Sequence, residues 1–196
     1  MEQTKKTWVD YYKKFGIYIF LAVVFVFFAI FAPNFLSSNN VINILRHVSM
    51  FGIVVVGVSA VMIGGGMDLS VGGQMAVVGM ILGYLMVNLN LGIVPAILIG
   101  ILTGCIFGSL NGILAIKLHM APIIVTLSMM LVLQGVAYLI TGGYPITGMP
   151  EGFTRIGQGY IGIIPVPVII FVLFVVFGWV VMNKTYLGRQ IYALGG

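Results

Sequence analysis

Residues 63–73 read IGGGMDLSVGG and interrupt the apolar part of this 196-residue chain. Asp68 is the only charged residue between positions 48 and 116. Glycines permit the backbone conformations that end a helix. Asp68 or Ser70 can then cap the free N–H groups of the next helix, where the macrodipole favours a negative charge. The stretch therefore predicts a break between two hydrophobic helices.

Two interpretations of Asp68 follow from this break. An acid at the centre of a membrane helix costs about 2.5–3.5 kcal/mol on insertion scales. Asp68 is either a structural N-cap at the cytoplasmic end of a helical hairpin, or it lies deeper and lines a polar path, as discontinuous helices do in many transporters. A phosphate-binding loop is excluded, because no Lys-Ser/Thr pair follows the glycines and no strand precedes them.

The composition places the chain in lipid. It is 61% hydrophobic and 7% charged, whereas soluble domains average about 25% charged residues. Spanning a bilayer takes about 20 apolar residues, and six runs are expected to cross. We predict an all-α, polytopic transmembrane helical bundle with spans at residues 16–32, 51–67, 71–87, 91–116, 122–141 and 165–182. Residues 41–50 are expected to lie at the interface or to extend the next helix.

The basic residues predict the orientation, because cytoplasmic loops are enriched in Lys and Arg. With six crossings both termini are expected in the cytoplasm, leaving only Arg46 and Arg155 outside. The cytoplasmic basic residues are then Lys5, Lys6, Lys13, Lys14, Lys117, Lys184 and Arg189. The outer segment, residues 142–164, is longer than an ordinary connection. It is either a flexible loop or a structured external surface.

The fourth and fifth spans carry small and polar residues. Glycines four residues apart share one helix face and let a neighbouring backbone approach, which predicts a packing face at Gly100, Gly104, Gly108 and Gly112. Leu at Gly104 or Gly108 is accordingly expected to destabilise the fold. Polar residues that could line a translocation path are Asp68, Ser70, Thr126, Ser128 and Gln134, although interhelical hydrogen bonding is the commoner role for a buried Gln.

The sequence offers no enzymatic constellation. His47 and His119 are far apart and have no Glu companion, and Cys105 is the single cysteine. A Ser-His-Asp set and paired carboxylates are also missing. We therefore predict no catalytic, cofactor-binding or metal-binding residues. The few, scattered basic residues do not indicate nucleic-acid binding.

Four motifs in order resemble the permeases of sugar ABC importers of the ribose, galactose, xylose and autoinducer-2 group. They are residues 64–73 (GGGMDLSVGG), 121–129 (APIIVTLSM), 139–146 (LITGGYPI) and 185–196 (TYLGRQIYALGG). The first contains the signature residues Gly64, Gly65, Gly66, Asp68, Leu69, Ser70 and Gly72. The last resembles the lead-in to a cytoplasmic coupling segment, with Gly188, Arg189, Tyr192, Gly195 and Gly196. Met67 stands where the family usually has Ile, and Ser128 where it usually has Gly.

The resemblance implies a multi-pass permease subunit of the bacterial cytoplasmic (inner) membrane that moves sugar by alternating access. Its implied partners are a second permease copy, identical or not, a periplasmic or lipid-anchored sugar-binding protein, and an ATPase subunit that uses the ATP. It also implies about ten spans, so this chain is expected to be an N-terminal portion that does not support ATP-coupled uptake alone. The alternatives are a secondary transporter or channel subunit, or a non-transporting fragment that needs a separately encoded second half.

Overall fold

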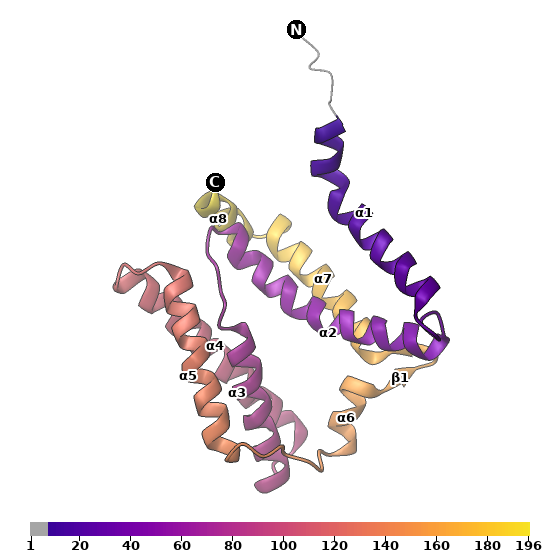
Figure 1. Ribbon diagram of the computed structural model, residues 1–196. Coiled ribbons are helices and arrows are strands. Elements are labelled where there is room, and N and C mark those ends of the chain that lie inside the picture. Colours follow the sequence, from indigo (N-terminus) through magenta and orange to yellow (C-terminus); the bar gives the residue numbers. More distant parts are fainter. Residues whose placement is uncertain (1–7) are drawn as a thin grey trace. The chain divides into compact units, whose positions relative to one another are not determined.

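The computed structural model describes residues 8–196, and nearly all of them are helical (Figure 1). The chain divides into two compact units, the first extending to Leu45 and the second comprising Arg46–Gly196. Helix α1 is Trp8–Phe31, and helix α2, Ser38–Ile63, begins in the first unit and continues into the second. Each unit is therefore described by itself.

In the first unit, aromatic side chains hold the turn between α1 and α2. The ring of Phe35 lies edge-on to Phe25, with centroids 5.3 Å apart, and stacks on Phe28 at 5.9 Å. Asn40 Nδ2 donates a hydrogen bond to the carbonyl oxygen of Phe35 at 2.7 Å. Asn34 adopts a positive φ of 61°, which Asn tolerates better than most residues. The turn is thus fixed by local contacts.

The core of the second unit lies around α3. Helix α3, Val71–Gly83, continues into one π-helical turn, η1, Tyr84–Asn88. It packs against both α4, Ile93–Lys117, and α5, Pro122–Thr141 (Figure 1). Val77 of α3 and Leu133 of α5 are fully buried where the two helices meet, next to Ala137.

Residues 142–164 contain regular structure. Helix α6 is Glu151–Gln158, and strands β1, Tyr160–Ile161, and β2, Ile164–Pro165, form a short antiparallel hairpin. Arg46 Nη2 donates to Tyr160 Oη at 2.5 Å, and its guanidinium lies 5.2 Å from the centre of that ring. The structure thus shows residues 142–164 as a structured segment rather than as a flexible loop.

Helix α7, Val166–Lys184, packs against α2 through two glycines. A Cβ placed on Gly52 of α2 would lie 2.8 Å from Phe171 Cζ, and one placed on Gly178 of α7 would lie 2.7 Å from Val56 Cγ1. Each helix therefore inserts a side chain where its neighbour has none. The two helices thus fit together through side chains that occupy the space left by the glycines.

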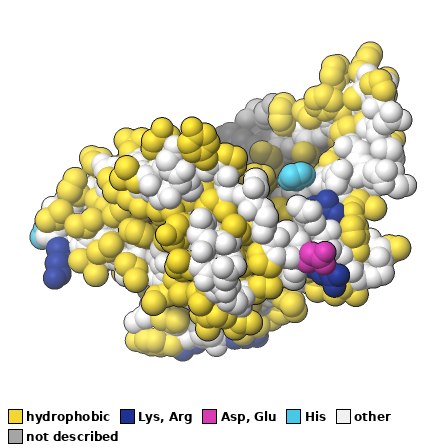
Figure 2. All heavy atoms as spheres, turned by 90° about the horizontal axis from the view of Figure 1, so that it is seen from below, with side chains coloured by type: hydrophobic (Ala, Val, Ile, Leu, Met, Phe, Trp, Pro, Cys, Tyr) yellow, Lys and Arg dark blue, Asp and Glu magenta, His cyan; other side chains and the backbone are white. Residues whose placement is uncertain are grey.

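Among the described residues, five helices are long and apolar enough to cross a membrane. They are α2, Val71–Asn88, α4, α5 and α7, while the apolar part of α1, Phe15–Phe31, is shorter. Residues 41–50 form the first part of α2, and α2 ends at Ile63 rather than continuing to position 67. Hydrophobic side chains cover much of the face in Figure 2, and charged ones are few. Such a surface suits contact with lipid.

Candidate functional site

The helix break is built around Asp68. Residues 64–70 cross from α2 to α3 as irregular backbone, and Gly65 has a φ of 79°, which favours glycine. Asp68 Oδ1 accepts hydrogen bonds from the backbone N–H of Ser70 at 2.8 Å and from Ser70 Oγ at 2.6 Å. The carboxylate therefore binds the backbone N–H of Ser70, the residue before α3. Neither Asp68 nor Ser70 makes the predicted side-chain cap to the first N–H groups of α3.

Ser70 connects three polar side chains. Its Oγ donates to Asp68 and accepts from Gln74 Nε2 and from Asn111 Nδ2, each at 2.7 Å. A hydroxyl has one proton and two acceptor positions, so the hydrogen-bonding capacity of Ser70 Oγ is filled. The residue is fully buried. We call Asp68, Ser70, Gln74 and Asn111 the Ser70 network.

The network fixes the orientation of the Asn111 amide. The carboxylate of Asp68 can only accept, so it takes the single proton of Ser70. Asn111 must then present its NH2 group to Ser70, because a flipped amide would place two acceptors together. Its Oδ1 is thereby turned away from Ser70. Asn111 is 6% exposed, and this oxygen has no hydrogen-bond partner among the described residues.

A cavity of about 250 Å³ lies beside the network. Its polar lining residues are Asp68, Asn111 and Thr126, and Gly108 and Gly112 of α4 leave space on one wall. Thr126 Oγ1 donates to the carbonyl oxygen of Pro122 one turn earlier, at 2.9 Å. Its proton is thus engaged within α5. The remaining walls are apolar.

The structure brings together part of the set of path residues that the sequence suggested. Asp68, Ser70 and Thr126 meet at this break. Ser128 and Gln134 are exposed on α5 and do not line this cavity. Asn111 was not among the predicted path residues, and the available signal was its amide in the mainly apolar second half of α4, which also contains Ser109 and Lys117.

The glycine face of α4 differs from its expected role. A Cβ on Gly100 would lie 3.0 Å from Leu82 Cδ2, but one on Gly104, Gly108 or Gly112 would meet nothing within 4 Å. Within the described residues these three glycines face open space, so nothing here supports destabilisation by Leu at Gly104 or Gly108. Between α3 and α5, by contrast, Gly73 lies close to the backbone of the neighbouring helix.

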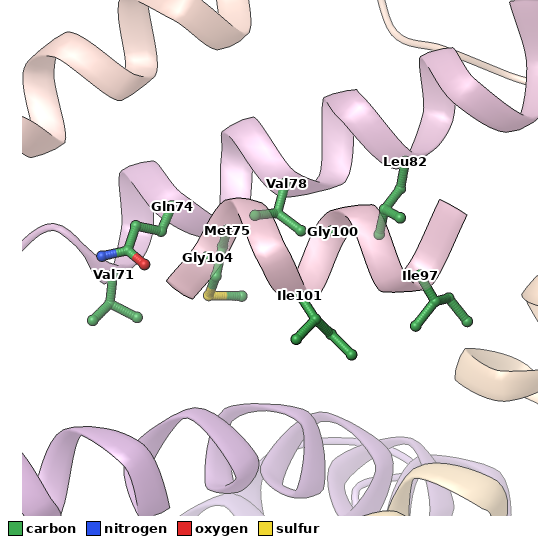
Figure 3. A pocket seen from close by; sticks show the side chains of 9 residues that line it. All are labelled: Val71, Gln74, Met75, Val78, Leu82, Ile97, Gly100, Ile101 and Gly104. Carbon is green, nitrogen blue, oxygen red and sulfur yellow. The ribbon is translucent and has the colours of Figure 1, made fainter. Parts of the chain in front are cut away.

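A second cavity, of about 330 Å³, lies between α3 and α4 (Figure 3). Gln74 is its single polar side chain, and the others, including Val78 and Ile101, are apolar. Its glycines, Gly100 and Gly104, come from α4. This lining offers almost no hydrogen-bonding partner to a hydrophilic solute. It contrasts with the polar cavity beside Asn111.

Helix α8, Tyr186–Gly195, contacts the break and contains most of the residues expected to lead into a coupling segment. A Cβ on Gly64 would lie 3.6 Å from Ile191 Cγ2, and one on Gly195 would lie 3.2 Å from the carbonyl carbon of Gly64. Thr185 Oγ1 accepts from the Gly188 N–H at the start of the helix. Gly188 is buried, Arg189, Tyr192 and Gly195 are exposed, and Gly196 follows the helix.

The described residues contain no cluster of three or more His, Cys, Asp or Glu that could hold a metal ion. Asp68 forms no ion pair with any described Lys or Arg, whereas on α6 Arg155 pairs with Glu151 at 3.6 Å. The break is therefore a hydrogen-bonded polar site. Its groups can exchange hydrogen bonds with a solute.

Comparison with known proteins gives a consistent result. The family model described as branched-chain amino acid transport system / permease component matches residues 40–196. The ribose import permease of Bacillus subtilis is 38% identical over 188 residues, covering 94% of this chain and 58% of the relative. The galactose/methyl galactoside import permease of Escherichia coli K12 is 32% identical over 210 residues, covering 98% and 62%. The chain thus spans about three fifths of these relatives. No solved structure matches significantly.

Proposed function

Because the chain belongs to the family of branched-chain amino acid transport system permease components, we propose that it is a permease subunit of an ATP-driven sugar importer. It is a multi-pass protein of the bacterial cytoplasmic membrane. The family match covers residues 40–196, which include the helix break and the cavity beside it. The observation that carries the proposal of sugar import is the 38% identity with a ribose import permease. The similar proteins are named for ribose, galactose and allose transport.

A sugar crossing a bilayer must replace its hydrogen bonds to water with hydrogen bonds to protein. Asp68 and Asn111 offer such groups in a region where most lining is apolar. In this proposal the helices around the break form part of the translocation path. The chain itself carries out no covalent chemistry and binds no ATP.

The position of α8 supports a link to a cytoplasmic partner. Its C-terminal end contacts Gly64, four residues before Asp68. A displacement of α8 would therefore be transmitted to the break through direct contact. The proposed partners are an ATPase subunit on the cytoplasmic side, an external sugar-binding protein, and a second permease copy, identical or related.

Uptake measurements test this function. The gene and its neighbours are expressed in a strain lacking its own sugar importers, and uptake of labelled ribose, galactose and allose is measured, with leucine as the comparison solute. We expect uptake of at least one sugar and dependence on the partner's ATPase activity. Uptake of leucine without any of the three sugars would contradict the proposal.

Asp68→Ala separates a path role from a capping role. The change removes the oxygen that accepts hydrogen bonds from the backbone N–H and from the hydroxyl of Ser70. It also removes the charge from the cavity. We expect sugar uptake to fall about tenfold or more while membrane abundance falls less than twofold. Asp68→Asn is the matched control, because its amide oxygen can still accept the backbone hydrogen bond. Equal losses of uptake and abundance would leave only the capping role.

A further inference from the structure

A third cavity, of about 270 Å³, lies at the ends of α3 and α5 that are remote from the break. It is lined by Tyr84 and Asn88 of the π-helical turn η1, by Thr141 at the end of α5 and by Tyr144 after it. The apolar helix from the break to η1, Val71–Asn88, has 18 residues, which corresponds to a length of about 27 Å. The hydrocarbon core of a bilayer is about 30 Å thick. The cavity and the break therefore lie near opposite faces of the membrane.

A tight turn after α5 places Tyr144 at the cavity. Gly142 and Gly143 end the helix with φ values of 63° and 83°, which glycine adopts without steric cost. The backbone N–H of Tyr144 then donates to the carbonyl oxygen of Thr141 at 3.2 Å. The position of this tyrosine is thus set by the backbone of the turn.

The π-helical turn supplies the other polar side chains. The N–H of Leu89 donates to the carbonyl oxygen of Tyr84, five residues earlier, at 3.2 Å. Such turns are rare and frequently occur at functional sites. A Cβ placed on Gly83 would lie 3.2 Å from Ile146 Cδ1, so the chain after Tyr144 packs directly against the start of η1. The two parts of the lining are therefore held next to each other.

The polar groups of this cavity are accessible and not engaged within the protein. Tyr84, Asn88 and Tyr144 are all exposed, and their side chains form no hydrogen bond with any residue of the described part of the chain. A phenol hydroxyl both donates and accepts, and an amide offers donors and acceptors. Thr141 Oγ1, in contrast, already donates to the carbonyl oxygen of Ala137. A solute in the cavity thus meets free donors and free acceptors.

The lining matches a neutral solute with hydroxyl groups. None of the nine lining residues is charged, so the carboxylate and ammonium groups of an amino acid would lose water without gaining a charged partner. Sugar hydroxyls donate and accept, and tyrosine combines an apolar ring with a polar tip. Pockets for drug-sized ligands are about 300–1,000 Å³, so a smaller cavity suits a monosaccharide. Aromatic belts explain tyrosines at a membrane interface, but they do not explain the amide of Asn88 between them.

We propose that this cavity is an outer binding site for a neutral monosaccharide, in which Tyr84, Asn88 and Tyr144 form hydrogen bonds with sugar hydroxyls. The inference rests on the proposed sugar import and adds the site at which sugar first contacts this chain. The bias of Lys and Arg toward the cytoplasm places residues 142–164, and with them this cavity, on the outside. The absence of charge from the lining selects sugars over amino acids.

Protection from thiol labelling tests the site in the transporter purified with its ATPase and without the sugar-binding protein. All variants carry Cys105→Ala, because Cys105 is the single cysteine. Pro145→Cys places a thiol at an exposed lining position and keeps every polar lining side chain, and Thr147→Cys repeats the measurement without changing the proline. Gln158→Cys, exposed on α6, lies outside the lining.

We expect ribose, galactose or allose at tens of millimolar to slow maleimide labelling of Pro145→Cys and Thr147→Cys at least threefold and to leave Gln158→Cys unchanged. Leucine at equal concentration is expected to protect none of them. Failure of all three sugars to protect either lining cysteine would overturn the proposal. Equal protection by leucine, or equal protection of Gln158→Cys, would also overturn it.

Asn88→Leu tests the amide. The position is exposed, and changes at such positions usually stay within about 0.5 kcal/mol, so the fold should be retained while protection by sugar falls at least threefold. Gln134→Leu is the matched control, because it removes an exposed amide of α5 that does not line the cavity. Equal protection in the two variants would overturn the role of Asn88.

Uptake by the same transporter, reconstituted with its sugar-binding protein, separates the two proposals. Sugar uptake without protection of the lining cysteines would reject the outer site and leave sugar import standing. Protection without uptake of any sugar would keep the site and reject the import function.

Discussion

Ser70 is the residue on which the polar groups of the break converge. Its hydroxyl joins Asp68 in the loop, Gln74 one turn later, and Asn111 on a helix 41 residues away in sequence. Three hydrogen bonds at one buried oxygen make the arrangement sensitive to single changes, because each lost bond leaves a buried partner unpaired.

Ser70→Ala is therefore expected to destabilise the protein. It leaves the amide NH2 of buried Asn111 without an acceptor, which costs about 1–3 kcal/mol. Thermal unfolding in detergent should show a clearly lower Tm. The matched control is Ser128→Ala at an exposed position of α5, where surface changes stay within about 0.5 kcal/mol. Similar Tm values for the two variants would contradict the network.

At the scale of elements, α3 is the helix on which the bundle of the second unit depends. It packs against α4 and α5, and it approaches α5 most closely at Gly73. A Cβ there would lie 2.7 Å from the carbonyl oxygen of Met130 and 3.1 Å from Leu133 Cβ. Backbone atoms cannot move aside as a flexible side chain can, so the contact requires glycine.

Gly73→Ala should accordingly push α3 and α5 apart, at a cost of about 1–3 kcal/mol for overpacking. Gly79→Ala on the same helix is the control, because its added Cβ meets nothing within 4 Å and Ala favours helix over Gly by about 1 kcal/mol. Chemical or thermal unfolding in detergent distinguishes them. A Gly73→Ala protein as stable as Gly79→Ala would show that the two helices are not in close contact.

At the scale of the whole molecule, the distribution of basic residues predicts the orientation in the membrane. Two of them, Lys117 and Lys184, lie in the last turns of α4 and α7. A third, Arg189, lies on α8, which contacts the break at Gly64. Residues 142–164, with the exposed pair Glu151 and Arg155, connect the opposite ends of α5 and α7. The bias of Lys and Arg toward the cytoplasm therefore predicts that the break faces inward.

Cysteine labelling checks this orientation. In a Cys105→Ala background, which removes the single cysteine, we introduce His119→Cys, between α4 and α5, and Thr147→Cys, between α5 and α6. Both positions are exposed. A membrane-impermeant maleimide added to spheroplasts should label Thr147→Cys at once and His119→Cys only after permeabilisation. The opposite order would reverse the predicted topology, and equal labelling before permeabilisation would show that the spheroplasts leak.

The sequence by itself determined the all-helical membrane class, the location of the break and the family resemblance. Hydropathy, glycine content and a motif are local properties, so they can be read without knowing which helices meet. Two local features needed the structure. One is that Asp68 accepts a hydrogen bond from the backbone N–H of Ser70, and the other is the π-helical turn after α3.

Only the tertiary structure decided which residues meet. It joined Asn111 to Ser70 and left Ser128 and Gln134 away from the cavity. It also placed a close contact between glycine and a neighbouring backbone at Gly73 rather than at Gly104, Gly108 or Gly112. In a membrane protein, lipid-facing and buried positions are both apolar, so hydrophobic periodicity does not identify the face of a helix that packs. The rotation of each helix is set by its neighbours. The break that marks this chain thus became a buried hydrogen-bond network only when α4 placed Asn111 beside it.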